Sequence, residues 1–311
     1  MEIVITKERA GKTVKEILTK EMKLSTRFLT KLKYSSDTGI TVNGSHVTVR
    51  CVLQAGDILR LETEDMEPSE KILPVRLPLD IVYEDADIVL CNKPADMPTH
   101  PSHGHTDDTL ANALAWHYRE AGEPFVFRPV NRLDRNTSGL VLVAKNRLSS
   151  LRLYRSMTRG EIQKTYLAIL DGVPEKREDV IDRFICRGEN SIICRVVCDE
   201  RAPGAMRAVT GYRVLAENGT HSLVEVHPKT GRTHQIRVHF ASIGTPITGD
   251  DLYGSPSPDI PRHALHAYEL TIPHPADGHP VTFRAPLAEE MRGLAERYFR
   301  YSEDKEDSTD A

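Results

Sequence analysis

The chain has 311 residues, of which 39% are hydrophobic, and carries a formal net charge of −4 at pH 7. These values are typical of a soluble globular protein with room for about two domains. No apolar run approaches the roughly 20 residues that a membrane helix needs, and residues 1–7 lack the long apolar segment of a secretory signal, so we expect a cytoplasmic protein without a membrane partner.

The charge is unevenly distributed along the chain. Residues 12–33 contain seven basic and two acidic residues, whereas residues 301–311 contain five acids and one lysine. A local basic patch of this kind attracts phosphate groups whatever the total charge, although a charged helical face is often simply solvated. The acidic segment has almost nothing apolar to bury, so residues 301–311 are expected to form a disordered tail.

Residues 1–64 are expected to form a small N-terminal α/β domain. A first helix is indicated by four apolar residues at helical spacing, Val14, Ile17, Leu18 and Met22. Ser25 and Thr26 offer a cap for a second helix. Asn43-Gly44 lies between two β-branched runs and predicts a hairpin, because both residues tolerate positive φ. Residues 56–61 then supply the last strand.

A second, larger domain is expected over residues 79–300. Residues 65–78, rich in acids and prolines, are expected to be the linker that precedes it. Apolar patterns predict strands at 81–83, 88–91, 140–144, 166–170, 192–197, 212–215 and 223–226, and helices at about 109–121, 147–158, 234–243 and 287–300. Because these strands cluster without regular βαβ alternation, the pattern predicts an α+β fold with a mixed, largely antiparallel central sheet and flanking helices.

Charged and hydroxyl residues crowd the start of one predicted strand. The segment Asn-Arg-Leu-Asp-Arg-Asn-Thr-Ser-Gly at 131–139 runs directly into the apolar run 140–144. The anionic form of Asp134 should be favoured by its neighbours Arg132 and Arg135, and an ionised, positioned carboxylate can act as a nucleophile. Taken alone, the segment is also compatible with a polar loop in which Asp134 caps a turn.

This segment resembles the catalytic motif of the RluA-like pseudouridine synthases. Two further motifs of that family follow in the expected order, Lys-Thr-Tyr at 164–166 and Thr-Gly-Arg-Thr-His-Gln-Ile-Arg-Val-His at 230–239. The resemblance implies that Asp134 is the catalytic aspartate, that Tyr166 stacks on the target base, and that Arg237 pairs with the aspartate. Asn131 departs from the family, in which many members carry histidine at that position.

The resemblance also implies contacts with RNA. Arg132 matches the residue that fills the gap left by a flipped base, and planar guanidinium and phenol groups both stack on bases. Residues 12–64 resemble the RNA-binding domain of ribosomal protein S-four. The expected RNA contacts in the two domains are Arg132, Arg135, Arg232, Arg27, Lys31 and Lys33, with Lys145 and Arg262 as further phosphate contacts.

The expected activity is therefore isomerisation of uridines in structured RNA, with large-subunit ribosomal RNA favoured and transfer RNA the other candidate. The reaction joins ribose to a ring carbon instead of a ring nitrogen, with no net redox change, so we expect no cofactor. We also expect no metal, because the five cysteines lack paired spacing and none completes a ligand set beside His100, His103 and His105. The expected protein is a monomer.

Two other functions fit part of the pattern. A glycosidase or nucleoside hydrolase also attacks an anomeric carbon with a carboxylate, but it usually needs a second carboxyl group, and the only acids close behind a motif are Asp250 and Asp251. A non-catalytic RNA-binding or ribosome-assembly protein could keep the same fold. Such a protein would be expected to have lost Asp134 or Arg237, and both are present.

Overall fold

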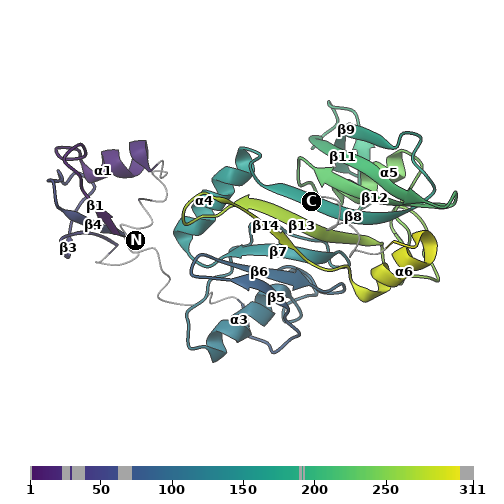
Figure 1. The fold of residues 1–311 in the computed structure, drawn as a ribbon, viewed down its shortest axis with the longest axis horizontal. Coiled ribbons are helices and arrows are strands. Elements are labelled where there is room, and N and C mark those ends of the chain that lie inside the picture. Colours follow the sequence, from purple (N-terminus) through teal and green to yellow (C-terminus); the bar gives the residue numbers. More distant parts are fainter. Residues whose placement is uncertain are drawn as a thin grey trace, which may run out of the picture.

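The computed structural model describes residues 2–22, 29, 39–61, 72–188, 191 and 193–301. They form two units, a small N-terminal one and a larger one that begins at about residue 72 (Figure 1). No helix in the described part of the chain is long and apolar enough to cross a bilayer.

The N-terminal unit is a four-stranded antiparallel sheet with a short helical segment packed on it. Its strands are β1 (Glu2–Val4), β2 (Ile40–Val42), β3 (Ser45–His46) and β4 (Ile58–Leu61), in the order β1-β4-β2-β3. The predicted hairpin is confirmed, since Asn43 and Gly44 have φ values of 50° and 80°. The first helix is present as α1 (Val14–Glu16) and the π-helical η1 (Ile17–Glu21). The second helix falls on residues that lie, apart from Leu29, outside the described ones.

The larger unit is built on one ten-stranded sheet, ordered β10-β9-β11-β12-β8-β13-β7-β6-β5, with β14 paired to β13. All its strand pairs are antiparallel except β7 with β13. The mixed, largely antiparallel α+β fold is thus confirmed. Its strands are β5 (Ile81–Glu84), β6 (Ile88–Lys93), β7 (Ser138–Ala144), β8 (Gln163–Asp171), β9 (Glu178–Arg187), β10 (Arg195–Cys198), β11 (Met206–Glu217), β12 (His221–Pro228), β13 (Leu265–Pro273) and β14 (Pro280–Arg284). Its helices are α3 (Leu110–Glu120), α4 (Arg147–Thr158), α5 (Gln235–Ser242) and α6 (Glu289–Phe299).

Strands β6 and β7 contain the continuous apolar runs 88–91 and 140–144 because the sheet is covered on both faces there. Figure 1 shows α3 on one side of these strands and α4 on the other. One face packs with α3 through Val89, Cys91, Val141 and Val143. The opposite face packs with Leu153 of α4 through Ile88, Leu90, Leu140 and Leu142. Packing on both faces holds β7 in place. It thereby also positions the segment before β7, which carries Asp134.

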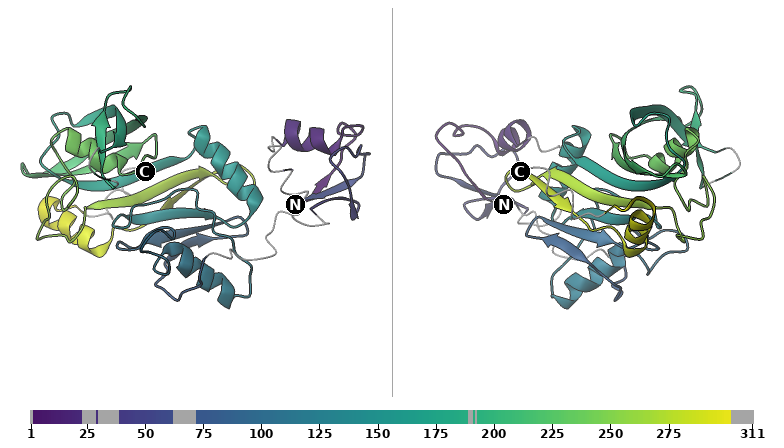
Figure 2. Two further views of the ribbon diagram at one scale, coloured as in Figure 1. Left: turned by 180° about the vertical axis from the view of Figure 1, so that it is seen from behind. Right: turned by 45° about the vertical axis from the view of Figure 1, so that its right-hand side comes forward.

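The two units meet at α4. Leu148 and Leu151 of that helix belong to the apolar cluster of the N-terminal unit, and Arg155 donates a hydrogen bond of 3.2 Å to the Met22 carbonyl. Both views in Figure 2 show the N-terminal unit beside the end of the sheet where α4 lies. Within the second half of the expected linker, the Leu73 carbonyl accepts from Asn112 at 2.8 Å and Leu77 packs on the main core. The larger unit therefore includes residues before the expected boundary at 79.

Candidate active site

The three motifs meet at one cleft of about 930 Å³. The segment before β7, the start of β8 and the segment entering α5 all line it. Among the described residues, Asp134 is the one carboxylate in its wall. Six cationic side chains share that wall, Arg132, Arg135, Lys164, Lys229, Arg232 and Arg237. The cleft is therefore strongly positive around a single acid, which suits a polyanionic substrate.

Hydrogen bonds fix the backbone on both sides of Asp134. The hydroxyl of Thr99 donates to the Leu133 carbonyl at 3.0 Å and accepts from the Leu133 amide at 3.1 Å. The Thr137 amide donates to the carbonyl of Asp134 at 3.1 Å. The Asp134 side chain, 28% exposed, thus projects from a rigid turn into the cleft.

A buried lysine holds the next carbonyl of this turn. Lys93, at the end of β6, is fully buried and donates to the carbonyls of Arg135 at 3.1 Å, Pro94 at 2.8 Å and Met97 at 2.7 Å. Burial, assisted by the positive charge of Arg262, lowers the pKa of Lys93 to about 7. Lys93 was not predicted from the sequence, because its three acceptors are brought to it only by the folded chain.

Arg262 supports the turn from the other side. It is 5% exposed, donates to the Asn136 carbonyl at 3.1 Å and pairs with Glu290 at 2.7 Å. The prediction that Arg262 contacts phosphate is therefore wrong, because its guanidinium is occupied inside the protein. Lys145, predicted for the same role, does not line the cleft and pairs with Glu84 at 2.7 Å.

Gly139 allows the turn to enter the sheet. Its φ is 108°, a conformation that strongly favours glycine, and a Cβ there would lie 2.3 Å from the carbonyl oxygen of Ala267. The close approach arises because β7 and β13 pair in parallel at this point, with Gly139 opposite Ala267. Gly139 is thus required both by the turn and by the neighbouring strand.

Two cationic or ionisable groups approach the Asp134 carboxylate from the segment around α5. Arg237 Nη1 lies 3.6 Å from Asp134 Oδ2, and His234 Nε2 lies 3.9 Å from the same oxygen. Arg237 reaches the cleft because Ile236 and Phe240 face the core, as the helical periodicity predicted. The structure therefore brings Asp134 and Arg237 together.

The arginines that flank Asp134 in sequence turn away from its carboxylate. Arg135 pairs with Asp96 at 2.6 Å, and Arg132 Nη1 lies 3.5 Å from His100 Nε2. The expectation that these two arginines hold Asp134 is therefore wrong, because adjacent side chains of a turn point in different directions. Both still line the cleft, where they can contact RNA.

Arg237 is itself held by a buried carboxylate. Its Nε and Nη2 donate to the two oxygens of Asp250, each at 2.7 Å. Burial alone would raise the pKa of Asp250, but the hydrogen bonds and charge of Arg237, together with smaller contributions from His263 and the Leu252 amide, hold that pKa below the usual range. Asp250 is fully buried and absent from the cleft wall, so it does not supply the second carboxyl group that a glycosidase would use.

His234 has its ring orientation fixed by Tyr253. The Tyr253 hydroxyl accepts a hydrogen bond from the Arg195 amide at 2.8 Å and lies 2.8 Å from His234 Nδ1. One hydrogen bond thus joins this hydroxyl to the imidazole. Burial lowers the pKa of His234, which favours the neutral imidazole. In the sequence, His234 is marked only by its place in the third motif, and nothing singles out Tyr253.

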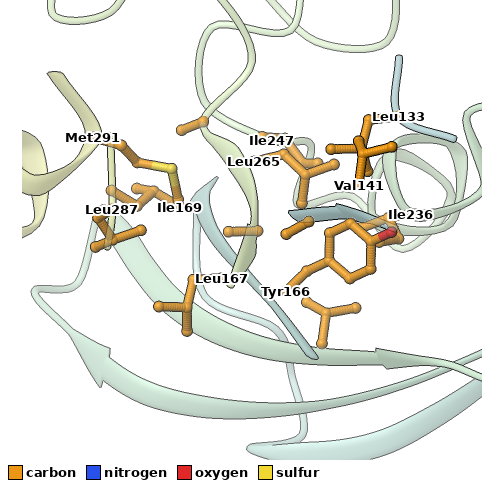
Figure 3. Packing of buried hydrophobic residues seen from close by; sticks show 14 of the residues in the cluster. Leu133, Val141, Tyr166, Leu167, Ile169, Ile236, Ile247, Leu265, Leu287 and Met291 are labelled. Atoms are coloured by element: carbon orange, nitrogen blue, oxygen red, sulfur yellow. The ribbon is translucent and has the colours of Figure 1, made fainter. Parts of the chain in front are cut away.

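Tyr166 presents its ring to the cleft from β8. The side chain is 8% exposed, and Figure 3 shows it among the apolar side chains of Ile236 and Val141. Burial, with a contribution from the charge of Asp134, raises the pKa of the Tyr166 phenol, which therefore stays neutral. One face of a neutral aromatic ring in such a wall can stack on a nucleobase.

Of the remaining predicted RNA contacts, one lines the cleft and three lie outside the described residues. Arg232 is exposed on the loop before α5 and lines the cleft. Arg27, Lys31 and Lys33 lie outside the described residues. Asn131, the position that departs from the family pattern, binds β7 by donating to the Leu140 carbonyl at 3.0 Å and accepting from the Leu142 amide at 2.8 Å.

Comparisons with known proteins identify the family. The RNA pseudouridylate synthase family matches residues 87–242. A Bacillus subtilis relative, the uncharacterized RNA pseudouridine synthase YjbO, is 38% identical over 91% of this chain and 98% of its own. Ribosomal large subunit pseudouridine synthase D of Vibrio cholerae is 35% identical over 81% of each chain.

A solved human structure shares the fold. It is the RNA pseudouridylate synthase domain containing 1 protein, 28% identical, with a TM-score of 0.58 over 77% of this chain and 95% of that chain. The family match, the relatives and the convergence of the three motifs on one positive cleft lead to the same conclusion: this chain belongs to the RNA pseudouridine synthases, isomerases that act on RNA.

Proposed function

We propose that this enzyme isomerises specific uridines of large-subunit ribosomal RNA, with Asp134 as the catalytic carboxylate. The observation that supports Asp134 most directly is that it is the one carboxylate among the described residues of the cleft wall, 3.6 Å from Arg237. The ribosomal substrate is supported by relatives of 33 to 36% identity that are named ribosomal large subunit pseudouridine synthase D.

The reaction breaks the bond between ribose C1′ and uracil N1, turns the base and forms a bond from C1′ to C5. The proton on C5 is then lost and N1 gains one, so no electrons are exchanged with a cofactor. Asp134 either attacks C1′ or removes the proton from C2′. In both routes it must start ionised and lie close to the sugar, and Arg237, at 3.6 Å, stabilises its charge.

The target uridine has to leave its stack before Asp134 can reach the ribose, which costs a few kcal/mol. Tyr166 stacks on the flipped uracil, and Arg132 fills the vacancy. Arg135 and Arg232, which line the same cleft, bind the backbone. Lys31, Lys33 and Arg27 of the N-terminal unit extend the contact to structured RNA. The enzyme acts as a monomer in the cytoplasm.

The test uses unmodified large-subunit ribosomal RNA transcribed from the gene of the same organism, with pseudouridine mapped at each position after incubation. Wild-type enzyme should convert one or a few defined uridines. Asp134→Asn should convert none while its affinity for the RNA stays within a few fold. Asp277→Asn, at an exposed loop position, is the matched control and should keep full activity.

Mapping in cells completes the test. A uridine that loses its modification on deletion of the gene should regain it with wild type and not with Asp134→Asn. Full activity of the Asn variant would refute the catalytic role. Conversion confined to transfer RNA would refute the ribosomal substrate while leaving the role of Asp134 intact.

A further inference from the structure

Lys164 occupies the wall of the cleft beside Tyr166. The two residues are separated by one position on β8, so their side chains lie on the same face of the strand about 7 Å apart. Both line the cleft. The Lys164 side chain is largely buried, and burial is the cause that lowers its pKa.

The Lys164 ammonium lacks the partners that the other buried cations near the site possess. Lys93 donates to three carbonyls, Arg262 pairs with Glu290, and Arg237 binds Asp250. Within the part of the chain that the structure describes, no hydrogen bond or ion pair involves Lys164 Nζ. Lys164 Nζ is not among the buried polar atoms that lack a partner, so it reaches the solvent of the cleft. A partly desolvated ammonium without a protein partner is suited to bind an anion that enters the cleft.

The surroundings of Nζ are open and positive. Gly231 lies beside the amine, since a Cβ built there would be 3.9 Å from Nζ, at ordinary van der Waals distance. Lys229 and Arg232 are exposed on the same loop. Three cations thus border one side of the cleft, and none of the described residues in the cleft wall besides Asp134 is acidic.

We propose that Lys164 binds a phosphodiester group of the RNA strand that carries the target uridine. With the uracil stacked on Tyr166, Lys164 lies two residues earlier on the same face of β8. It therefore meets the RNA backbone that leads to that nucleotide. Lys229 and Arg232 continue the phosphate path toward solvent. The inference rests on the proposed function in that the ligand is substrate RNA, and it assigns Lys164 to binding and not to the reacting atoms.

The first test measures RNA affinity as a function of salt. The probe is the shortest fragment of large-subunit ribosomal RNA that wild-type enzyme isomerises. Lys164→Gln should weaken binding about tenfold or more at low salt and reduce the slope of log affinity against log salt by about 0.7 to 0.9, the value for one phosphate contact. Lys164→Arg should restore most of the affinity and most of the slope. Lys176→Gln, an exposed lysine outside the cleft, is the matched control.

The second test locates the phosphate. Single methylphosphonate substitutions, which remove one charge, are placed in turn around the target uridine. One position should weaken binding by wild type and have no further effect on Lys164→Gln. If the slope is unchanged and every substitution affects the two proteins equally, the assignment is wrong. Because binding is measured with a fragment that wild type turns over, this failure is distinct from a failure of the proposed substrate, in which no ribosomal fragment is isomerised.

Discussion

Arg237 donates its two shortest hydrogen bonds to Asp250, each at 2.7 Å, and meets Asp134 with its remaining nitrogen at 3.6 Å. The guanidinium therefore connects a carboxylate that is fully buried with one that faces the cleft. Asp250 fixes the orientation of Arg237, and Arg237 in turn acts on Asp134. The arginine is a positioned cation whose geometry does not depend on substrate.

Asp250→Asn should therefore lower both stability and turnover. An amide cannot accept from both guanidinium nitrogens, and breaking one side of a buried pair costs about 3 kcal/mol of unfolding free energy. We expect kcat to fall at least tenfold while RNA affinity changes little, measured by single-turnover conversion and urea denaturation. The control is Asp251→Asn, whose side chain is 68% exposed and 3.9 Å from Arg237. Equal effects of the two variants would contradict the anchoring role.

Gly139→Ala should be far more harmful than alanine at a comparable glycine. The added Cβ would meet the Ala267 carbonyl at 2.3 Å and would also strain a φ of 108°. Gly219 has a φ of 87° with nothing within 4 Å of its Cβ position, so Gly219→Ala isolates the backbone strain, about 1 kcal/mol. Denaturation should show a loss for Gly139→Ala several kcal/mol larger. Similar losses would mean that β13 can move away from β7.

Lys93 should make stability depend on pH. Its pKa is about 7 in the folded protein and about 10.4 in an unfolded chain, so between these values the unfolded state binds more protons. Stability of wild type relative to Lys93→Met should therefore rise as pH increases from 7 to 10, by up to about 1.4 kcal/mol per unit. Below pH 7 the difference should be constant. Denaturation curves for both proteins across this range test the slope, and a flat difference would refute the lowered pKa.

Reversing the charge of Lys31 and Lys33 to Glu should weaken RNA binding and lower its salt dependence, because two phosphate contacts would be lost. The fragment that wild type isomerises is again the ligand. The control is the double variant Lys7→Glu and Lys176→Glu, at two exposed lysines, which changes the net charge by the same amount. An unchanged salt slope would remove these lysines from the RNA contact while leaving the catalytic site unaffected.

The sequence predicted the elements whose apolar pattern is strong. All four helices of the larger unit lie within two residues of their expected bounds. Apolar residues recur at helical spacing in each of them, although α5 also buries the polar residues between. Strands β9, β13 and β14 were missed. β9 alternates exposed charged residues with buried ones, and β13 contains His266 and Glu269, so neither forms a continuous apolar run. Their burial depends on neighbours that are distant in sequence.

The site was predictable where one local motif carries the chemistry and not where distant residues complete it. Asp134 and Arg237 were placed together by motif resemblance, and the structure brings them to 3.6 Å. The buried supports, Lys93 and Asp250, are charged residues whose partners are fixed only by tertiary packing. A single sequence cannot distinguish such a buried charge from a solvated one, which also explains the wrong prediction for Arg262.

The place of β13 in the sheet constrains when the enzyme can become active during synthesis. This strand, residues 265–273, lies between β7 and β8, which are completed a hundred residues earlier in the chain. In a nascent polypeptide that ends before residue 265, the edges of β7 and β8 that face β13 are unpaired. The turn of Asp134 and the ring of Tyr166 are then not held in one sheet. The two halves of the cleft are joined only when β13 has left the ribosome. Truncated products should therefore be unable to modify RNA.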